Sequence, residues 1–569
     1  MKHLFTSLML FFACIPLCNG IFVNVSLGQT SWINPSGGLF NDDANWSPFS
    51  PRNSDIASFD LDATYTIQLP QPQTLPIFGG TIDASLRGWQ QNVGDITLDG
   101  GQTLNISQDM LVSGGLSLGS NTRIDSDGTI SIGNETAGVI NLGAGSLLTS
   151  DELIVGNTFA GQVNMQPGSL IAPQTRFSDI TIGNEARGEV NVGQDARIDM
   201  EDYEIVVGRN AEGSLNLSPN SEISGDLGEI KIGFETGSTG TVRGDQTLID
   251  LQRITVGFLG GTGKLELTDS VLKLDNRLSI SLAGSARLSG TTIDLGGERI
   301  DNFGGELLID NESTGSISDL QVIRGGRATI ENSNLEIRDA TFSDNAQVTI
   351  SDGTVVTGAG NWDIGESAVL QVINGASINK AGGATNNGTV EVSADSSLTF
   401  TYELGKGIYR NESTIRYTGG FFFNPGGFFD IGNIEYTGDV DLSSPTNLLF
   451  DIESSDLADS ISVGGNLILD DVDDFQLNFS GNSLNTFEGD ELILIDIMGT
   501  RFGEFTGFAE GHMVTDGFFV GELSYLLGDG NDIGIRVISV VPEPSTALLL
   551  CFCLSSVALR RKRTSVQKP

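Results

Sequence analysis

The sequence contains almost no cysteine or histidine. Residues 21–550 hold no cysteine at all, and the four cysteines of the chain are Cys14, Cys18, Cys551 and Cys553. This excludes a disulfide-stapled scaffold, a cysteine-based zinc site and a thiol nucleophile for the main part of the chain. Beyond residue 20 the one histidine is His512. A histidine-rich metal site is therefore excluded, and a Ser-His-Asp triad would have to use that residue.

Basic residues are also scarce. The chain has 30 Lys and Arg against 73 Asp and Glu, a net charge of −43. Between the two end segments, residues 1–20 and 542–569, the count is 24 basic against 72 acidic. A surface this acidic repels nucleic acid and anionic lipid and attracts cations. We expect no nucleic-acid partner, and the charge is explained either by the solubility of a long surface or by binding of divalent cations.

Charged residues make up 18% of the chain, whereas glycine is abundant at 74 residues. A chain rich in Gly, Leu, Ile and Val and poor in Lys and Glu favours strands and tight turns over helices. The hydrophobic fraction of 38% is enough to build a core. Because 569 residues exceed what one compact core usually organises, several domains or a repeat array are expected.

The first twenty residues have the order of a secretory signal peptide. Lys2 and His3 precede an apolar run over residues 4–17, and Asn19 and Gly20 follow. We predict a signal peptide over residues 1–20 with cleavage after Gly20. Lipid attachment at one of the two cysteines in this run is the alternative.

The last residues have a second apolar segment. Val541-Pro542-Glu543-Pro544 is followed by an apolar stretch over residues 547–559 and then by Arg560, Arg561, Lys562 and Arg563. The stretch is slightly short of the ~20 residues that span hydrocarbon comfortably. The basic cluster behind it stays in the cytoplasm by the positive-inside rule. We predict a short C-terminal transmembrane helix with the long N-terminal part exported.

Residues 541–569 resemble the PEP-CTERM sorting signal of bacteria that possess an exosortase. The resemblance implies that Pro542, Glu543 and Pro544 form the recognition motif and that Arg560 to Arg563 form the retention signal. It also implies an exosortase-type processing enzyme as partner. The protein would be anchored in the inner membrane before processing and would then reach the cell envelope, the cell surface or an extracellular polysaccharide matrix.

The middle of the chain carries an internal repeat. The pair Ile-Gly or Val-Gly recurs at intervals of 23 to 27 residues, with its glycines at Gly133, Gly156, Gly183, Gly208, Gly233 and Gly257. A second column keeps the same phase, with Asn141, Asn164, Asn191 and Asn216, and continues with Arg243 and Glu266. A period of this length is typical of solenoids, propellers and arrays.

Each repeat contains short alternating strands separated by Gly, Asn and Asp, as in residues 130–132 and 190–192. About 24 residues is too short for a propeller blade and fits one coil of a right-handed parallel β-helix. We predict an all-β solenoid over residues 96–440, with less regular coils after residue 300. The glycines would permit positive φ at the corners, and the Asn column would form a hydrogen-bonded ladder.

Both flanks of the repeat are expected to cap it, since an open solenoid end would polymerise. Residues 21–95 would form the N-terminal cap and first strands, with Trp32 and Trp46 either plugging the first coil or stacking on carbohydrate. Residues 441–540 would form a β-rich C-terminal cap. Together with the repeat, these flanks resemble proteins with autotransporter-associated β-strand repeats, which implies architecture but no activity.

No cofactor is predicted, although two acidic clusters are candidates for Ca²⁺. One contains Asp471 and Asp473, and the other contains Asp529 and Asp532. Neither matches an EF-hand or a complete calcium-repeat motif. A solvated turn and a hairpin turn are the respective alternatives.

Two functions compete. The first is an exported structural or adhesive protein of the surface or extracellular matrix. The second is a carbohydrate-binding or carbohydrate-active β-helix protein with an extracellular polysaccharide as partner. Because β-helix enzymes need carboxylate pairs at set separations, and the repeat has few aromatic residues for sugar subsites, we predict that the protein is not an enzyme.

Overall fold

The computed structural model describes residues 28–540, except 53–54, 71–83, 173–178, 296, 394, 400–401, 405–407, 412–414, 417–432, 437–438, 442–446, 455–456, 459, 470–475, 481–487 and 516–518. Its secondary structure is β throughout, apart from two 3-10 turns, η1 (Asp43–Asn45) and η2 (Phe258–Gly260). No helix in this part of the chain has the length and hydropathy to cross a membrane. The predicted C-terminal helix lies outside the described residues.

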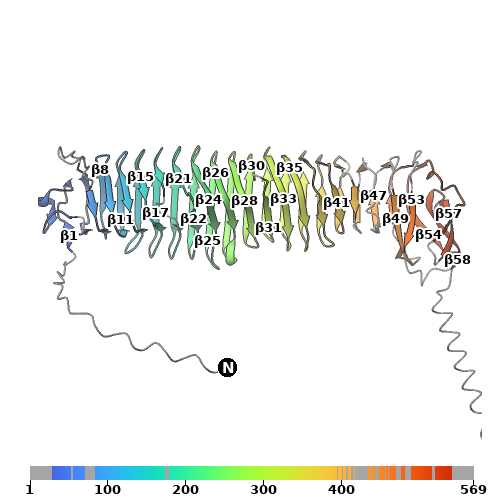
Figure 1. Ribbon diagram of the computed structural model, residues 1–569, viewed down its shortest axis with the longest axis horizontal. Helices are drawn as coiled ribbons and strands as arrows, with labels where there is room; N and C mark the ends of the chain where they lie inside the picture. The colour runs from blue at the N-terminus through green and yellow to red at the C-terminus, as the bar shows by residue number, and fades with distance from the viewer. Residues whose placement is uncertain are drawn as a thin grey trace, which may run out of the picture.

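The strands stack into a β-solenoid of about 15 turns, which confirms the predicted parallel coils. Figure 1 shows a straight rod with strands across its long axis, the N-terminal coils at one end and a hairpin at the other. One coil of the first half has three strands, such as β11 (Gly114–Leu118), β12 (Arg123–Ser126) and β13 (Thr129–Ile132). Each strand pairs in parallel with its equivalent in the next coil, about 4.8 Å away.

The equivalent strands form three columns. The first column runs β4 (Ile56–Phe59), β7 (Gly88–Gln91), β10 (Met110–Val112), β13, β16 (Glu152–Val155), β19 (Asp179–Ile182), β22 (Glu204–Val207), β24 (Glu222–Ile232), β26 (Leu248–Val256), β28 (Val271–Ser281), β31 (Arg299–Phe303), β33 (Thr314–Ile323), β35 (Asn334–Phe342), β38 (Trp362–Ile364), β41 (Gly383–Asn386) and β44 (Tyr402–Leu404). The second runs β2 (Gly38–Leu39), β5 (Thr64–Gln68), β8 (Asp95–Asp99), β11, β14 (Gly138–Leu142), β17 (Gly161–Met165), β20 (Gly188–Val192), β23 (Glu212–Leu217), β25 (Thr239–Asp245), β27 (Thr262–Thr268), β29 (Gly284–Ser289), β32 (Glu306–Asp310), β34 (Arg327–Glu331), β36 (Gln347–Ser351), β39 (Val369–Val372), β42 (Thr389–Val392), β45 (Ile408–Asn411) and β47 (Asn433–Tyr436). The third runs β6 (Ala84–Leu86), β9 (Thr103–Ile106), β12, β15 (Leu147–Thr149), β18 (Leu170–Ile171) and β21 (Arg197–Asp199), and it resumes at β30 (Thr292–Asp294), β37 (Val355–Gly358), β40 (Ser377–Lys380) and β43 (Ser397–Thr399).

The first and third columns belong to one 28-stranded sheet. In the middle coils the two strands of a coil fuse, so that β24, β26 and β28 each pair along both columns. A register shift between Gly225 and Glu229 bends the fused strand where separate strands would turn.

Coil length changes along the rod. Paired residues are 23 to 27 positions apart from Ile130 to Ile230, but 20 to 22 apart from Leu278 to Ala384. The corner connection explains the difference. It joins Ile132 to Gly138 between β13 and β14, whereas β31 is followed by β32 after two residues. From Leu278 to Ala384 the coils are therefore shorter but regular, and the prediction of less regular coils after residue 300 was wrong for this stretch.

Parallel pairing extends on both sides of residues 96–440. It begins where β1 (Gln29–Trp32) pairs with β4, and it continues through β51 (Ser460–Val463) to β54 (Glu491–Ile497). A smaller run pairs β46 (Ile415–Arg416), β48 (Val440–Asp441), β52 (Leu467–Ile468) and β55 (Arg501–Phe502). A three-stranded sheet contains β49 (Asn447–Ser454), β50 (Leu457–Ala458) and β53 (Gln476–Ser480).

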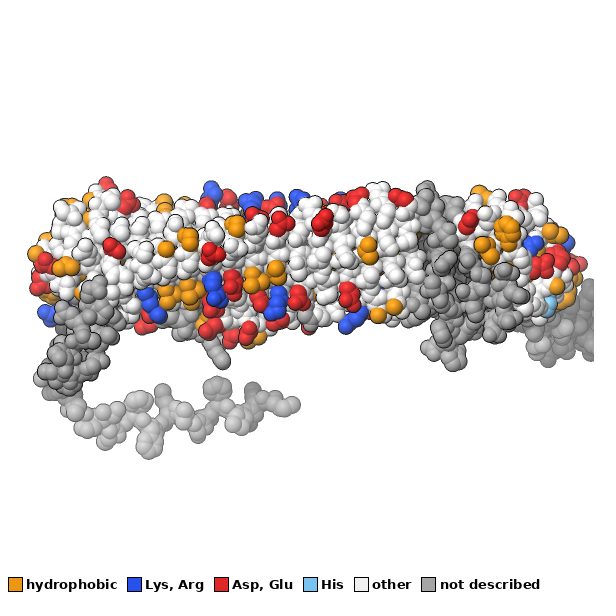
Figure 2. Space-filling model, turned by 90° about the horizontal axis from the view of Figure 1, so that it is seen from above, with side chains coloured by type: hydrophobic (Ala, Val, Ile, Leu, Met, Phe, Trp, Pro, Cys, Tyr) orange, Lys and Arg blue, Asp and Glu red, His pale blue; other side chains and the backbone are white. Residues whose placement is uncertain are grey.

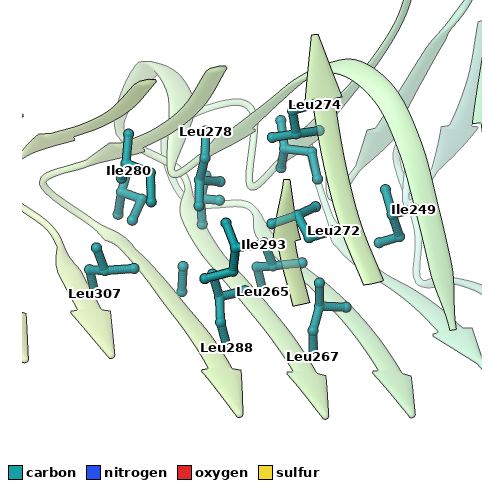
Figure 3. Close-up of a cluster of buried hydrophobic side chains, with 14 of the residues drawn as sticks. Ile249, Leu265, Leu267, Leu272, Leu274, Leu278, Ile280, Leu288, Ile293 and Leu307 are labelled. Carbon is teal, nitrogen blue, oxygen red and sulfur yellow. The ribbon is translucent and has the colours of Figure 1, made fainter. Parts of the chain in front are cut away.

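The core is a set of aliphatic stacks that run the length of the rod. Alternate side chains of each strand point inward because successive residues of a strand face opposite sides. Ile205, Ile230 and Ile254 occupy one stack, and each is fully buried. Figure 3 shows such side chains from several columns meeting in the centre of the coil. Each buried aliphatic side chain contributes roughly 1.5–3 kcal/mol.

One lysine lies inside this core. Lys380 is 1% exposed, and its Nζ donates to the carbonyl oxygens of Ile337 and Arg338, at 2.6 Å for Arg338. Gly358, its partner in the adjacent coil, makes the room, since a Cβ there would lie 2.8 Å from Nζ. The ammonium also lies 5.4 Å from the ring centroid of Trp362. Burial lowers the pKa of Lys380 to about 8.

Aromatic residues close the N-terminal end. Trp32 and Trp46 are buried and pack edge to face, with ring centroids 5.1 Å apart. The indole of Trp46 donates to the carbonyl oxygen of Phe40 at 2.6 Å. β3 (Trp46–Ser47) pairs antiparallel with β1 and covers part of its free edge. Both rings plug the first coils, and neither is exposed as a stacking platform.

Antiparallel strands close the other end. β57 (Phe519–Leu527) pairs with β56 (Met513–Thr515) and with β58 (Asp532–Val540), which returns along β54. Tyr525 is buried there, accepts from the amide of Phe505 at 3.1 Å and donates to the carbonyl oxygen of Phe508 at 2.6 Å. The coil stack thus ends in antiparallel strands instead of another open rung.

Candidate functional site

The glycines of the repeat stand in one corner column. The residues before them, Ile132, Val155, Ile182, Val207, Ile232 and Val256, are direct partners from coil to coil. The six corner glycines, Gly133, Gly156, Gly183, Gly208, Gly233 and Gly257, have φ between 68° and 80°. At Gly208 a Cβ would lie 2.4 Å from the carbonyl oxygen of Thr239 in the next coil. The corner therefore requires glycine for both backbone angle and space.

The asparagines form a ladder on the outer face of the second column. Each Nδ2 donates to the Oδ1 of the asparagine one coil earlier, at 2.9 Å for Asn164 to Asn141, 2.9 Å for Asn191 to Asn164 and 2.8 Å for Asn216 to Asn191. Asn141 donates to Ser117 at 3.1 Å. The side chains are half-buried, so these bonds are partly shielded from water. All point the same way along the rod.

We expect Asn164→Ala to destabilise the full chain by about 1–2 kcal/mol and Asn216→Ala by about half as much. Asn164 makes two ladder bonds, whereas Asn216 makes one. Both lose the same side chain from equivalent strand positions, so each variant is the control for the other. Urea unfolding of the two proteins measures the difference. Equal losses would contradict a ladder contribution.

A second asparagine ladder was not predicted from the sequence. Directly after the corner glycines, Asn157 donates to Asn134 at 3.4 Å and Asn184 donates to Asn157 at 3.1 Å. Its signal was present, because Asn follows Ile-Gly or Val-Gly in three successive repeats. In the next coils Arg209 and then Phe234 take this place, and the Phe234 ring lies 5.3 Å from that of Phe258.

A column of charged residues follows the first strand column. Glu152, Asp179, Glu204 and Glu229 occupy one position in successive coils, and Arg253, Arg277 and Arg299 continue it. Lys231 pairs with Glu204, Arg253 pairs with Glu229, and Arg277 and Arg299 both pair with the buried Asp301. Figure 2 shows acidic and basic side chains side by side along the middle of the rod.

Like charges meet at the acidic end of this column. Burial, together with the carboxylates of Glu204 and Glu152, raises the pKa of Asp179. Two cations, Lys231 and Arg209, act in the opposite direction. The column is thus a set of structural ion pairs at its centre, with one carboxylate that is costly to ionise.

A hollow of about 610 Å³ opens where the asparagine ladder ends. It is lined by Asn216, Leu217, Arg243, Gly244, Asp245, Glu266, Leu267, Thr268, Arg287, Ser289 and Asn311. Arg243 donates to Glu266 at 2.7 Å, and Arg287 donates to Asp310 at 2.8 Å. The sequence placed Arg243 and Glu266 in the asparagine column but gave no signal for the hollow, which depends on neighbouring coils.

Of the two candidate calcium clusters, one lies outside the described residues and the other lies within them. Asp471 and Asp473 lie outside the described residues. Asp529 lies in the turn between β57 and β58, and the neighbouring Asp532 is buried and accepts the amide of Ile497 at 2.7 Å. Burial raises the pKa of Asp532. Within the described ranges no group of three or more His, Cys, Asp or Glu could hold a metal ion.

The two terminal segments are not part of the described structure. The signal-peptide residues 1–20, the motif Pro542, Glu543 and Pro544, and the cluster Arg560, Arg561, Lys562 and Arg563 all lie outside it. The roles given to them by the resemblance stay predictions.

Several solved structures resemble this chain. No family model and no curated protein matches the chain. Among the solved structures that match is the Hap adhesin of Haemophilus influenzae, at 12% sequence identity and a TM-score of 0.25. The match covers 87% of this chain and 66% of that chain, so this chain spans slightly less than two thirds of the adhesin.

Proposed function

We propose that the protein is an exported structural or adhesive rod of the cell surface or extracellular matrix, and that it acts as a scaffold. The observation that carries the proposal is the continuous parallel pairing from β1 to β54. From β7 to β41 each strand of the first column pairs in parallel with its equivalents one coil before and one coil after, and the second column pairs in the same way from β5 to β51. Such a stack is stiff along its axis and holds whatever is attached to one end at a fixed distance from the other.

The exterior of the rod supports the same proposal. Asparagine hydrogen bonds and ion pairs join one coil to the next along the rod axis. Such contacts are expected of a surface that serves packing and solubility over a long distance. The coils also form without cysteine, so their stability does not depend on the redox state of the compartment.

The proposed route to the surface depends on residues 541–569. β58 ends at Val540, two positions before Pro542, the first residue of the Pro-Glu-Pro motif. Two prolines there prevent another strand from pairing and favour an extended segment that an enzyme can reach. We propose that an exosortase-type enzyme recognises Pro542 to Pro544 and removes the segment containing Arg560 to Arg563.

Cell fractionation followed by mass spectrometry of the mature C-terminus tests this route. We expect the outer fraction to contain chains without Arg560 to Arg563. A Pro542→Ala/Pro544→Ala variant should instead accumulate in the inner membrane with an intact C-terminus, whereas the surface substitution Arg187→Ala should be processed normally. Recovery of the intact basic tail in the outer fraction would contradict the proposal.

A further inference from the structure

The hollow at the end of the asparagine ladder consists of two parallel rows of polar side chains. One row is Asn216, Arg243, Glu266 and Arg287, which are paired residues of β23, β25, β27 and β29. The other row contains Asp245, Thr268 and Ser289, two positions later on the last three of these strands. Leu217, Gly244 and Leu267 lie between the rows at buried positions, so the base of the hollow there is strand backbone.

Gly244 lies at a buried, inward-facing position between the two rows. A Cβ there would lie 3.0 Å from Leu267 and 2.5 Å from the hydroxyl oxygen of Thr247. Leu217 and Leu267 of the neighbouring coils likewise face the core and are 5% and 1% exposed. The hollow therefore has a base of strand backbone between two hydrogen-bonding rows that follow the rod axis.

The charges of the lining cancel. Arg243 and Arg287 oppose Asp245 and Glu266, on a chain whose net charge is −43. A polyanion would meet the acidic surface around the hollow, and a polycation would meet the two guanidinium groups. A neutral ligand avoids both penalties and can use the donors and acceptors in equal measure.

The side chains are held in place and keep bonding capacity. Arg243 is fixed by Glu266 and Arg287 by Asp310, yet each arginine side chain is more than half exposed. A guanidinium presents five N–H donors in a rigid fork, of which the ion pair uses part. Asn216 adds an amide at the end of the ladder. Its Oδ1 accepts no hydrogen bond from the described residues.

We propose that this hollow binds a linear, uncharged polysaccharide that lies along the rod axis. Planar amide, carboxylate and guanidinium groups suit adjacent sugar hydroxyls, which both donate and accept hydrogen bonds. Donors and acceptors recur at each coil, about 4.8 Å apart, which is close to the length of one sugar ring in an extended chain. The inference deepens the proposed function, since it gives the displayed rod a partner in a polysaccharide matrix.

Affinity electrophoresis of the full chain in mild detergent tests the proposal. The gels contain hydroxyethyl cellulose, laminarin or amylose as neutral chains, and polygalacturonate as an anionic chain. We expect at least one neutral glucan to retard the protein. The double variant Arg243→Ala/Arg287→Ala should weaken that binding at least tenfold.

The matched control is Arg187→Ala/Arg197→Ala. These arginines are similarly exposed and also paired with glutamates, but they lie outside the hollow, and the change in net charge is the same. The control should bind like the unaltered protein. Absence of binding to every neutral glucan, equal loss in both double variants, or binding to polygalacturonate alone would each overturn the proposal. None of these results bears on tail processing, so the two proposals fail separately.

Discussion

Gly208→Ala is expected to destabilise the rod by roughly 2–5 kcal/mol. Gly208 has a φ of 74°, which costs an alanine about 1–2 kcal/mol. In addition, its Cβ would lie 2.4 Å from the carbonyl oxygen of Thr239 and 2.7 Å from the amide nitrogen of Gly240. These are backbone atoms of the next coil and cannot rotate away, so the two coils must separate at this corner.

Gly168→Ala is the matched control. Gly168 has nearly the same φ, 71°, but a Cβ there meets no atom within 4 Å. Its cost should be limited to the same backbone strain of about 1–2 kcal/mol. Urea unfolding gives the two losses, and amide hydrogen exchange should show the opening at Gly208 spreading first to β23 and β25. Similar losses in the two variants would show that the coil contact does not restrict this corner.

Lys380 is expected to make stability rise with pH between about 8 and 10.5. Its folded pKa of about 8 lies below the ordinary lysine value of 10.5, because burial disfavours the charged form. In this window the unfolded chain holds the proton more tightly than the folded chain, so unfolding takes up a proton and becomes less favourable as pH rises. The shift corresponds to about 3 kcal/mol. Below pH 8 both states are protonated and the dependence ends.

Lys380→Met removes the titrating group while keeping a long side chain in the same space. We expect the stability of the unaltered protein, measured relative to this variant by urea unfolding at each pH, to increase across the window. Lys273→Met is the control, because Lys273 is an exposed lysine paired with Asp250 at 2.9 Å. If the difference in unfolding free energy between the unaltered protein and Lys380→Met did not change with pH, the buried amine would carry no depressed pKa.

The coil column was predictable because two independent residue types keep the same phase. Corner glycine is required wherever φ is positive and the next backbone is close, so its spacing reports the coil length directly. The asparagines repeat because a ladder bond needs the same residue in each coil. Both are local requirements that recur, and the sequence therefore shows them.

The coils at either end of the repeat do not have the Ile-Gly or Val-Gly pair at this corner. From β28 onward the corner carries Ser281, Phe303 and Ile323 in place of Ile-Gly, because a connection of two or three residues replaces the longer loop. At the N-terminus, Gln29 and Ile56 are paired across coils without any glycine corner of that type. Pairing between strands continues there, but no periodic residue pattern predicts it.

The hollow and the buried lysine could not be found from sequence for a different reason. Lys380 is acceptable because Gly358 precedes it by one coil and two carbonyl groups lie one coil further back. Likewise, Arg243 and Arg287 line one depression because three strands align. Such features depend on the relation between coils and not on the composition of any one of them.

The local character of the pairing has an evolutionary consequence. Each strand of the main columns contacts its counterparts one rung before and after, so duplication of a stretch of about 25 residues inserts a complete rung without altering either terminus. Gene rearrangement of this kind would change the reach of the molecule in steps of about 4.8 Å. Reach could thus be tuned across lineages while the terminal closures stay unchanged.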